Sequence, residues 1–118
     1  MEEELEIIMP DKENNDVSFL QLTGDLTRAS GERLLKYYPW EQGLPNGRNI
    51  LVINFTNVNY INSAGIAYLF RVCKLLHKNN VLIRTFGLEY HYEKMFHIVG
   101  LTKYMKFYPS EWAAVEDL

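Results

Sequence analysis

Residues 59–66 read NYINSAGI, and they join an apolar, strand-like stretch to a segment with the spacing of an amphipathic helix. Before them, residues 50–53 (ILVI) are continuously apolar, which is typical of a strand covered on both faces in a parallel sheet. Phe55 and Val58 continue this apolar signal into the turn. The sequence therefore predicts a strand, a turn and then a helix over 63–77, whose apolar positions recur every three or four residues: Ile66, Leu69, Phe70, Cys73 and Leu76.

The opposite side of this helix is predicted to face solvent, and it carries Tyr68, Arg71, Lys74 and Lys78. The pair Asn79-Asn80 supplies the turn chemistry that ends the helix. Because Cys73 lies on the apolar side, we expect it to be a small core residue and not a reactive thiol.

The remaining segments alternate between strand-like and helix-like patterns. The run Gly24-Asp25-Leu26-Thr27 breaks the pattern of the second strand, and either Asp25 or Thr27 is expected to cap the next helix. Strands are predicted at 5–9, 17–22, 81–86 and 106–108, helices at 28–38, 89–99 and 112–117, and loops at 10–16 and 40–49. We predict an α/β fold in one domain spanning 1–118, with about four helices and a mostly parallel four- to five-stranded sheet that starts with an antiparallel pair.

Composition excludes several classes of protein. The 118 residues carry a formal net charge of -3 without a basic stripe, which argues against direct nucleic-acid binding. A single cysteine excludes an internal disulfide framework and a multi-cysteine metal site. We expect a cytoplasmic protein without membrane insertion, because we find neither a signal peptide nor an apolar run long enough to span a bilayer. The acidic run Glu2-Glu3-Glu4 is interpreted as a solvated terminus.

Catalytic patterns are weak, and we expect no enzymatic activity, no metal and no cofactor. Ser63 lacks the glycine two residues earlier that a nucleophile elbow needs, because Ile61 stands there. His77 would lie roughly 20 Å from Ser63 along the same helix. The other two histidines, His91 and His97, are six residues apart, which does not match a metal pair on one helical face. A small enzyme of unknown class is the least favoured alternative.

Ser63 has two interpretations from local chemistry. In the first, Asn62 is the N-cap, Ser63 is the first helical residue, and Gly65 lets the helix approach the sheet closely. In the second, Ser63 is also exposed at the carboxyl edge of a parallel sheet, where ligand and switch sites gather in open α/β folds. A phosphoryl group there would lie beside free N–H donors, so it would change the surface shown to a partner without unfolding the domain.

Several short motifs together resemble the STAS domain family of bacterial anti-sigma factor antagonists. Residues 19–26 (FLQLTGDL) resemble an early strand of that family followed by its Gly-acidic-Leu turn, and residues 50–55 resemble the central strand. Residues 62–66 (NSAGI) are similar to the Asp-Ser-x-Gly-Leu signature. Gly87-Leu88 and 99–101 (VGL) match two later landmarks, so the resemblance covers nearly the whole chain.

This resemblance implies a phosphorylation-controlled switch. Its partners would be a serine kinase that doubles as an anti-sigma factor and a PP2C-type phosphatase, and Ser63 would be the phosphoacceptor. The adjoining partner surface would comprise Gly24, Asp25, Leu26, Thr27, Tyr60, Asn62, Ala64 and Gly65. The unmodified protein would bind the kinase and release the sigma factor in a partner-switching pathway that regulates transcription.

An unphosphorylated STAS adaptor, in a signalling complex or a lipid-transport or permease complex, is the alternative. It is favoured by Asn62 and Thr27, which stand where the family often has aspartates. Tyr37, Tyr38 and Trp40 would form an exposed contact patch for such an adaptor, or else a hydrophobic lid over the sheet.

Overall fold

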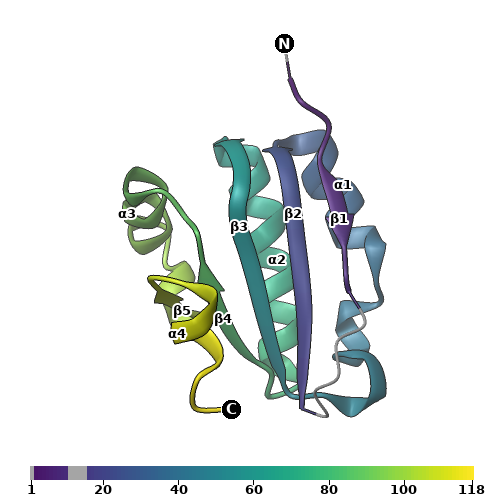
Figure 1. Ribbon diagram of the computed structural model, residues 1–118. Coiled ribbons are helices and arrows are strands. Elements are labelled where there is room, and N and C mark those ends of the chain that lie inside the picture. Colours follow the sequence, from purple (N-terminus) through teal and green to yellow (C-terminus); the bar gives the residue numbers. More distant parts are fainter. Residues whose placement is uncertain (1, 11–15) are drawn as a thin grey trace.

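The computed structural model describes residues 2–10 and 16–118, and it shows one five-stranded sheet in the order β1-β2-β3-β4-β5 (Figure 1). Strand β1 is antiparallel to β2, and every later pairing is parallel. The strands are β1 (Glu6–Ile8), β2 (Val17–Leu26), β3 (Ile50–Ile61), β4 (Leu82–Phe86) and β5 (Met105–Tyr108). The predicted α/β architecture, with its antiparallel first pair, is confirmed. The loop predicted at 10–16 lies largely outside the described residues.

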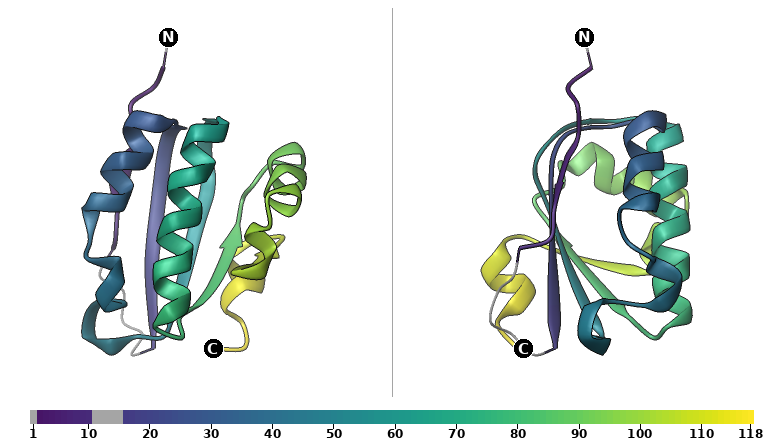
Figure 2. Two further views of the ribbon diagram at one scale, coloured as in Figure 1. Left: turned by 180° about the vertical axis from the view of Figure 1, so that it is seen from behind. Right: turned by 90° about the vertical axis from the view of Figure 1, so that its right-hand side faces the viewer.

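Helices follow the strands in the predicted order. They are α1 (Arg28–Tyr37), α2 (Ser63–Lys78), α3 (Tyr90–Ile98) and α4 (Glu111–Val115), with single 3-10 turns at η1 (Trp40–Gln42), η2 (Pro45–Gly47) and η3 (Leu101–Lys103). Helices α1 and α2 lie side by side on one face of the sheet, and α4 lies on the other (Figure 2). This arrangement explains why residues 50–53 are continuously apolar, since both faces of β3 are covered there.

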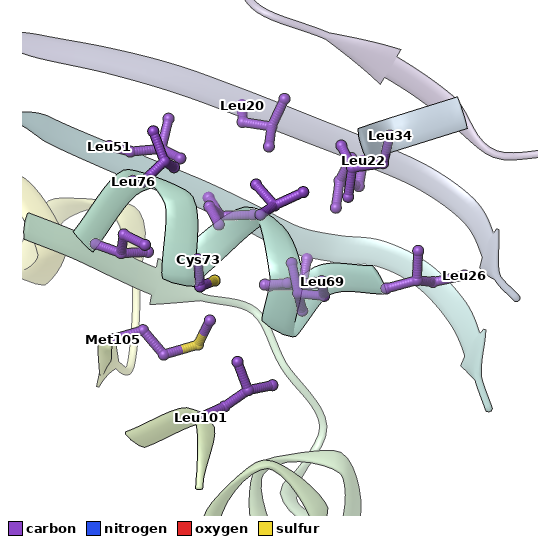
Figure 3. Close-up of a cluster of buried hydrophobic side chains, with 14 of the residues drawn as sticks. Leu20, Leu22, Leu26, Leu34, Leu51, Leu69, Cys73, Leu76, Leu101 and Met105 are labelled. Atoms are coloured by element: carbon purple, nitrogen blue, oxygen red, sulfur yellow. The ribbon is translucent and has the colours of Figure 1, made fainter. Parts of the chain in front are cut away.

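The main core lies between the sheet and α1 and α2. Figure 3 shows leucines of β2 and β3 meeting the inner side of α2, where Leu69, Cys73 and Leu76 are fully buried. Phe96 of α3 extends this core through an edge-on contact with Phe55 of β3. A smaller cluster on the opposite face packs under α4 and consists of Val17, Ile50, Val52, Phe86 and Ala114.

Two strands are longer than the sequence predicts. Strand β2 was expected to end at Leu22, yet it continues through Gly24 to Leu26, with irregular register on either side of Gly24. Strand β3 likewise runs past Phe55 and Val58 to Ile61. Both predictions were wrong for one reason: the two strands pair along their whole length, and this pairing stabilises polar segments that resemble turns.

The structure decides between the two alternatives left open for Trp40, and it shows that the solvent-facing position predicted for Tyr68 was wrong. Trp40 is fully buried, and its Nε1 donates a hydrogen bond to the Leu34 carbonyl at 2.9 Å, so it belongs to a hydrophobic lid and not to an exposed patch. Tyr68 is half-buried between the helices, because α1 approaches it at Gly31. A Cβ at Gly31 would lie 2.8 Å from the Cβ of Tyr68. The α1–α2 contact therefore requires glycine at 31.

Candidate functional site

Ser63 is the first residue of α2, and its side chain is exposed immediately beyond the carboxyl end of β3. Asn62 is the N-cap, and its Oδ1 accepts a hydrogen bond from the Gly65 N–H at 2.9 Å. Among the described residues, no group forms a hydrogen bond with the Ser63 hydroxyl. The N–H groups of Ser63 and Ala64 have no acceptor within the helix, as at any helix start. The hydroxyl is thus free beside two donors and the positive end of the helix dipole.

Gly65 fixes the distance between the start of α2 and the sheet. A Cβ at this position would lie 2.2 Å from the Leu26 carbonyl oxygen, far inside contact distance. The same oxygen accepts a hydrogen bond from the Asn62 N–H at 3.2 Å. The first turn of α2 is therefore held directly against the end of β2, as the role predicted for Gly65 requires.

The start of α1 lies next to the start of α2, because the β2–β3 pairing ends with Leu26 beside Ile61 (Figure 2). Thr27 is the N-cap of α1, and its N–H donates to the Ser30 Oγ at 2.8 Å. The Ser30 hydroxyl donates in turn to the Asp25 carbonyl at 2.7 Å. These residues are buried and satisfied, so they provide a rigid support for the surface around Ser63.

A second element at this edge is the N-terminal segment, which no sequence pattern placed there. Glu3 and Asp25 exchange two hydrogen bonds, from the Asp25 N–H to the Glu3 carbonyl at 3.0 Å and from the Glu3 N–H to the Asp25 Oδ2 at 2.7 Å. The Glu3 side chain accepts a hydrogen bond from Asn59 Nδ2 at 2.7 Å. The acidic side chains are exposed, as a solvated terminus requires, but the backbone at Glu3 is part of the structure.

A shallow depression of about 410 Å³ lies between the two helix starts. It is lined by Glu2, Thr27, Arg28, Ala29, Glu32 and Asn62. Its ionisable side chains are two glutamates and one arginine, so the surface beside Ser63 is slightly acidic. The acids come from the N-terminal segment and from α1, and not from positions 62 and 27.

Other reactive groups do not converge here. Burial raises the pKa of the Cys73 thiol to about 12, so this residue is an inert core side chain, as predicted. His91 and His97 are both exposed. The described part of the chain holds no group of three or more metal-ligating side chains. Over the same residues, none of the helices combines the length and apolar character needed to cross a membrane.

Comparison with known proteins identifies the fold. The family model described as STAS domain matches residues 9–114. The chain belongs to the STAS domain family. The match includes both the β2–α1 turn and the β3–α2 junction, whereas Glu2 and Glu3 of the N-terminal segment lie before the matched residues.

Solved structures with the STAS fold share little sequence with this chain. An anti-sigma factor antagonist from Mycobacterium paratuberculosis superimposes with a TM-score of 0.74 at 18% identity, over 96% of this chain and 92% of that one. For Bacillus SpoIIAA in its phosphorylated form the TM-score is 0.67 at 15% identity, over 96% and 97%. The murine anion transporter Slc26a9 gives 0.76 at 15% identity, over 98% of this chain but 22% of the transporter. At these identities the similarity shows the fold alone.

The STAS signature residues predicted as a partner surface divide into two groups. Tyr60 is half exposed, Ser63 is exposed, and Asn62 and Ala64 are partly exposed around it. The others are buried and lie beneath this surface: Gly24, Asp25, Leu26, Thr27 and Gly65. The exposed members thus belong to the β3–α2 junction, while the β2–α1 turn supports that junction from below.

Proposed function

We propose that this STAS domain is an anti-sigma factor antagonist-like switch, controlled by reversible phosphorylation of Ser63. It would act in the cytoplasm within a bacterial partner-switching pathway and would have no catalytic activity of its own. Its partners would be a serine kinase that is also an anti-sigma factor and a PP2C-type phosphatase. The observation that carries the proposal is the exposed Ser63 hydroxyl at the start of α2, to which no described residue forms a hydrogen bond.

The local geometry explains how a phosphoryl group would act there. Because the Ser63 hydroxyl has no partner among the described residues, modifying it breaks no contact that supports the fold. The added charge of about −1.5 to −2 would lie near the free N–H groups of the helix start, where an anion is favoured. A partner docked on Tyr60 and Ala64 would instead meet a desolvated dianion, which opposes binding. Phosphorylation would therefore control association and leave folding intact.

A kinase assay tests the proposal directly. The chain is incubated with ATP and each serine kinase encoded beside its gene, and the intact mass is measured. We expect the mass of one phosphoryl group to be added to the wild type and not to Ser63→Ala. Ser110→Ala is the matched control, because Ser110 is also an exposed serine at a helix start.

A pull-down completes the test. Ser63→Ala should retain the kinase and Ser63→Asp should lose it, and a PP2C-type phosphatase should restore binding of the modified wild type. Transfer of the phosphoryl group to another residue, or equal binding of both Ser63 variants, would rule out this switch.

The adaptor function remains the second candidate. It is favoured by Asn62 and Thr27 at positions where the family often has aspartates, and by the similar STAS fold in the Slc26a9 structure. An adaptor would bind the same partner whether residue 63 is Ser, Ala or Asp. Neighbouring genes for transporter subunits, in place of kinase and phosphatase genes, would support it.

A further inference from the structure

A second hollow lies at the opposite end of the sheet from Ser63, and nothing in the proposed switch uses it. It has a volume of about 290 Å³ and lies where β2 begins, beside the η2 turn and the residues that follow β1. The η2 turn runs past the lower ends of β1 and β2 in Figure 1. The walls are formed by Met9, Pro10, Ser18, Phe19, Pro45, Asn46 and Arg48.

Ser18 lines this hollow and carries an unpaired polar atom. Its side chain is 3% exposed, and its Oγ has no hydrogen-bond partner among the described residues. Ser18 lies on the same face of β2 as the core residues Leu20 and Leu22. An apolar residue would be expected at this position. Buried hydroxyls without a partner are rare in native proteins, and each one needs an explanation such as a bound molecule.

Arg48 contributes a second unpaired group. Its side chain is half-buried, its Nε is fully buried, and neither a hydrogen bond nor an ion pair forms with any described residue. By contrast, Arg84 pairs with Asp117, and Arg33 lies beside Glu4. A guanidinium keeps its charge at every physiological pH, so burying its Nε without a partner is unfavourable. Nε is also one of the donors with which arginine holds a carboxylate in a bidentate fork.

We propose that this hollow binds a small carboxylate that carries an apolar group. Arg48 holds the carboxylate, the Ser18 hydroxyl donates a further hydrogen bond, and the apolar walls of Met9, Pro10 and Pro45 enclose the rest. The volume is at the lower limit of known ligand pockets, so it suits a short organic acid and excludes a whole nucleotide. The apolar walls distinguish such an acid from inorganic phosphate, which would leave them uncovered.

Butyrate is the probe for this site, and amide chemical shifts in NMR spectra of the full chain report its binding. We expect saturable shifts at Ser18 and Arg48, with a Kd on the order of 1 mM for a ligand of this size. Arg48→Gln and Ser18→Ala should each weaken binding, Arg48→Gln by about tenfold or more. Arg71→Gln removes the same charge from an exposed site on α2 and should leave binding unchanged.

Comparison ligands make the assignment specific. Butyramide, which lacks the charge, should bind at least about tenfold more weakly than butyrate. Absence of saturable shifts, equal shifts in Arg48→Gln, or tighter binding of inorganic phosphate than of butyrate would each overturn the proposal. Arg48→Lys keeps the charge but loses the fork, so it should bind less tightly than the wild type.

Stability provides a readout that does not depend on the choice of probe. If the Ser18 hydroxyl has no partner, Ser18→Ala should unfold at the same urea concentration as the wild type or at a higher one. If Ser18→Ala unfolds at a lower urea concentration, the hydroxyl already has a partner and the site is wrongly assigned. These results do not depend on Ser63, so this proposal and the switch can fail separately.

Discussion

Substituting Gly65 by alanine tests the central geometric feature of the Ser63 site. In an exposed helix interior, alanine is more favourable than glycine by about 1 kcal/mol, so propensity alone predicts that Gly65→Ala stabilises α2. The structure predicts the opposite. The new Cβ would lie 2.2 Å from the Leu26 carbonyl oxygen and 2.6 Å from the carbonyl carbon. Since non-bonded heavy atoms pack at about 3.5 Å, the start of α2 would have to move outward by about 1 Å.

The expected loss follows from the contacts that this movement disturbs. Overpacking of this kind destabilises a core by about 1–3 kcal/mol. The same shift stretches the hydrogen bond from the Asn62 N–H to the Leu26 carbonyl, which is worth about 1 kcal/mol. After subtracting about 1 kcal/mol for the better helix former, we expect a net destabilisation of about 2 kcal/mol.

Urea unfolding followed by circular dichroism measures this value. With an m-value of about 2 kcal/mol/M, the midpoint for Gly65→Ala should fall by about 1 M. Ala67→Gly is the matched control, because Ala67 is exposed on the same helix and should lose only the propensity difference of about 1 kcal/mol. A Gly65→Ala variant as stable as the wild type, or more stable, would refute the close contact between α2 and β2.

Further predictions separate the cap, the core thiol and the C-terminal ion pair. In urea unfolding, Asn62→Ala should lose about 1 kcal/mol of stability because it removes the helix cap. The stability of Ser63→Ala should lie within about 0.5 kcal/mol of that of the wild type. A larger loss for Ser63→Ala than for Asn62→Ala would contradict the assigned roles. Burial raises the pKa of the Cys73 thiol to about 12, so iodoacetamide should alkylate it only after denaturation, and rapid labelling of the native protein would show that it is accessible. The Arg84 guanidinium lowers the pKa of the Asp117 carboxyl below its ordinary value of 3.8, so this pair stabilises the C-terminal segment above that pH, and its contribution is lost as the pH falls through the lowered pKa. The protection factors of the α4 amides, which compare the observed with the unprotected exchange rate at each pH, should fall over that acidic range, and Asp117→Asn should lower them at neutral pH. Unchanged protection in the variant would show that the ion pair does not hold α4.

Local chemistry in the sequence was sufficient to predict the start of α2. Asn62 is a strong N-cap residue, and the apolar spacing from Ile66 to Leu76 has a helical period, so both the helix and its first residue could be predicted. The alternation of strand-like and helix-like segments predicted the order of the elements along the chain. Gly65 could be assigned a close approach because a helix interior rarely contains glycine without such a reason.

The errors concern interactions between residues far apart in the sequence. Polar residues near the end of β3 resemble a turn, but they pair with β2, whose sequence lies more than thirty residues earlier. Gly24 has a φ of 111° and packs against the Glu4 carbonyl, so it marks an irregularity inside a strand and not its end. Trp40 is buried in the main core where η1 packs against α2, a helix that begins more than twenty residues later in the chain. None of these partners can be identified from local propensity.

The N-terminal segment supplies acidic side chains near Ser63, where Asn62 and Thr27 replace the aspartates that are common in the family. Asn62 accepts the capping hydrogen bond that an aspartate would accept, so the substitution removes a charge and leaves the helix start intact. Glu2 lines the same depression as Asn62, and Glu3 is tied to Asp25 and to Asn59 beside it. Negative charge is thus present at this edge of the sheet, but the N-terminal segment supplies much of it. A kinase that recognises acidic groups near Ser63 would have to bind Glu2 and Glu3, because Asn62, the residue before the serine, carries no charge.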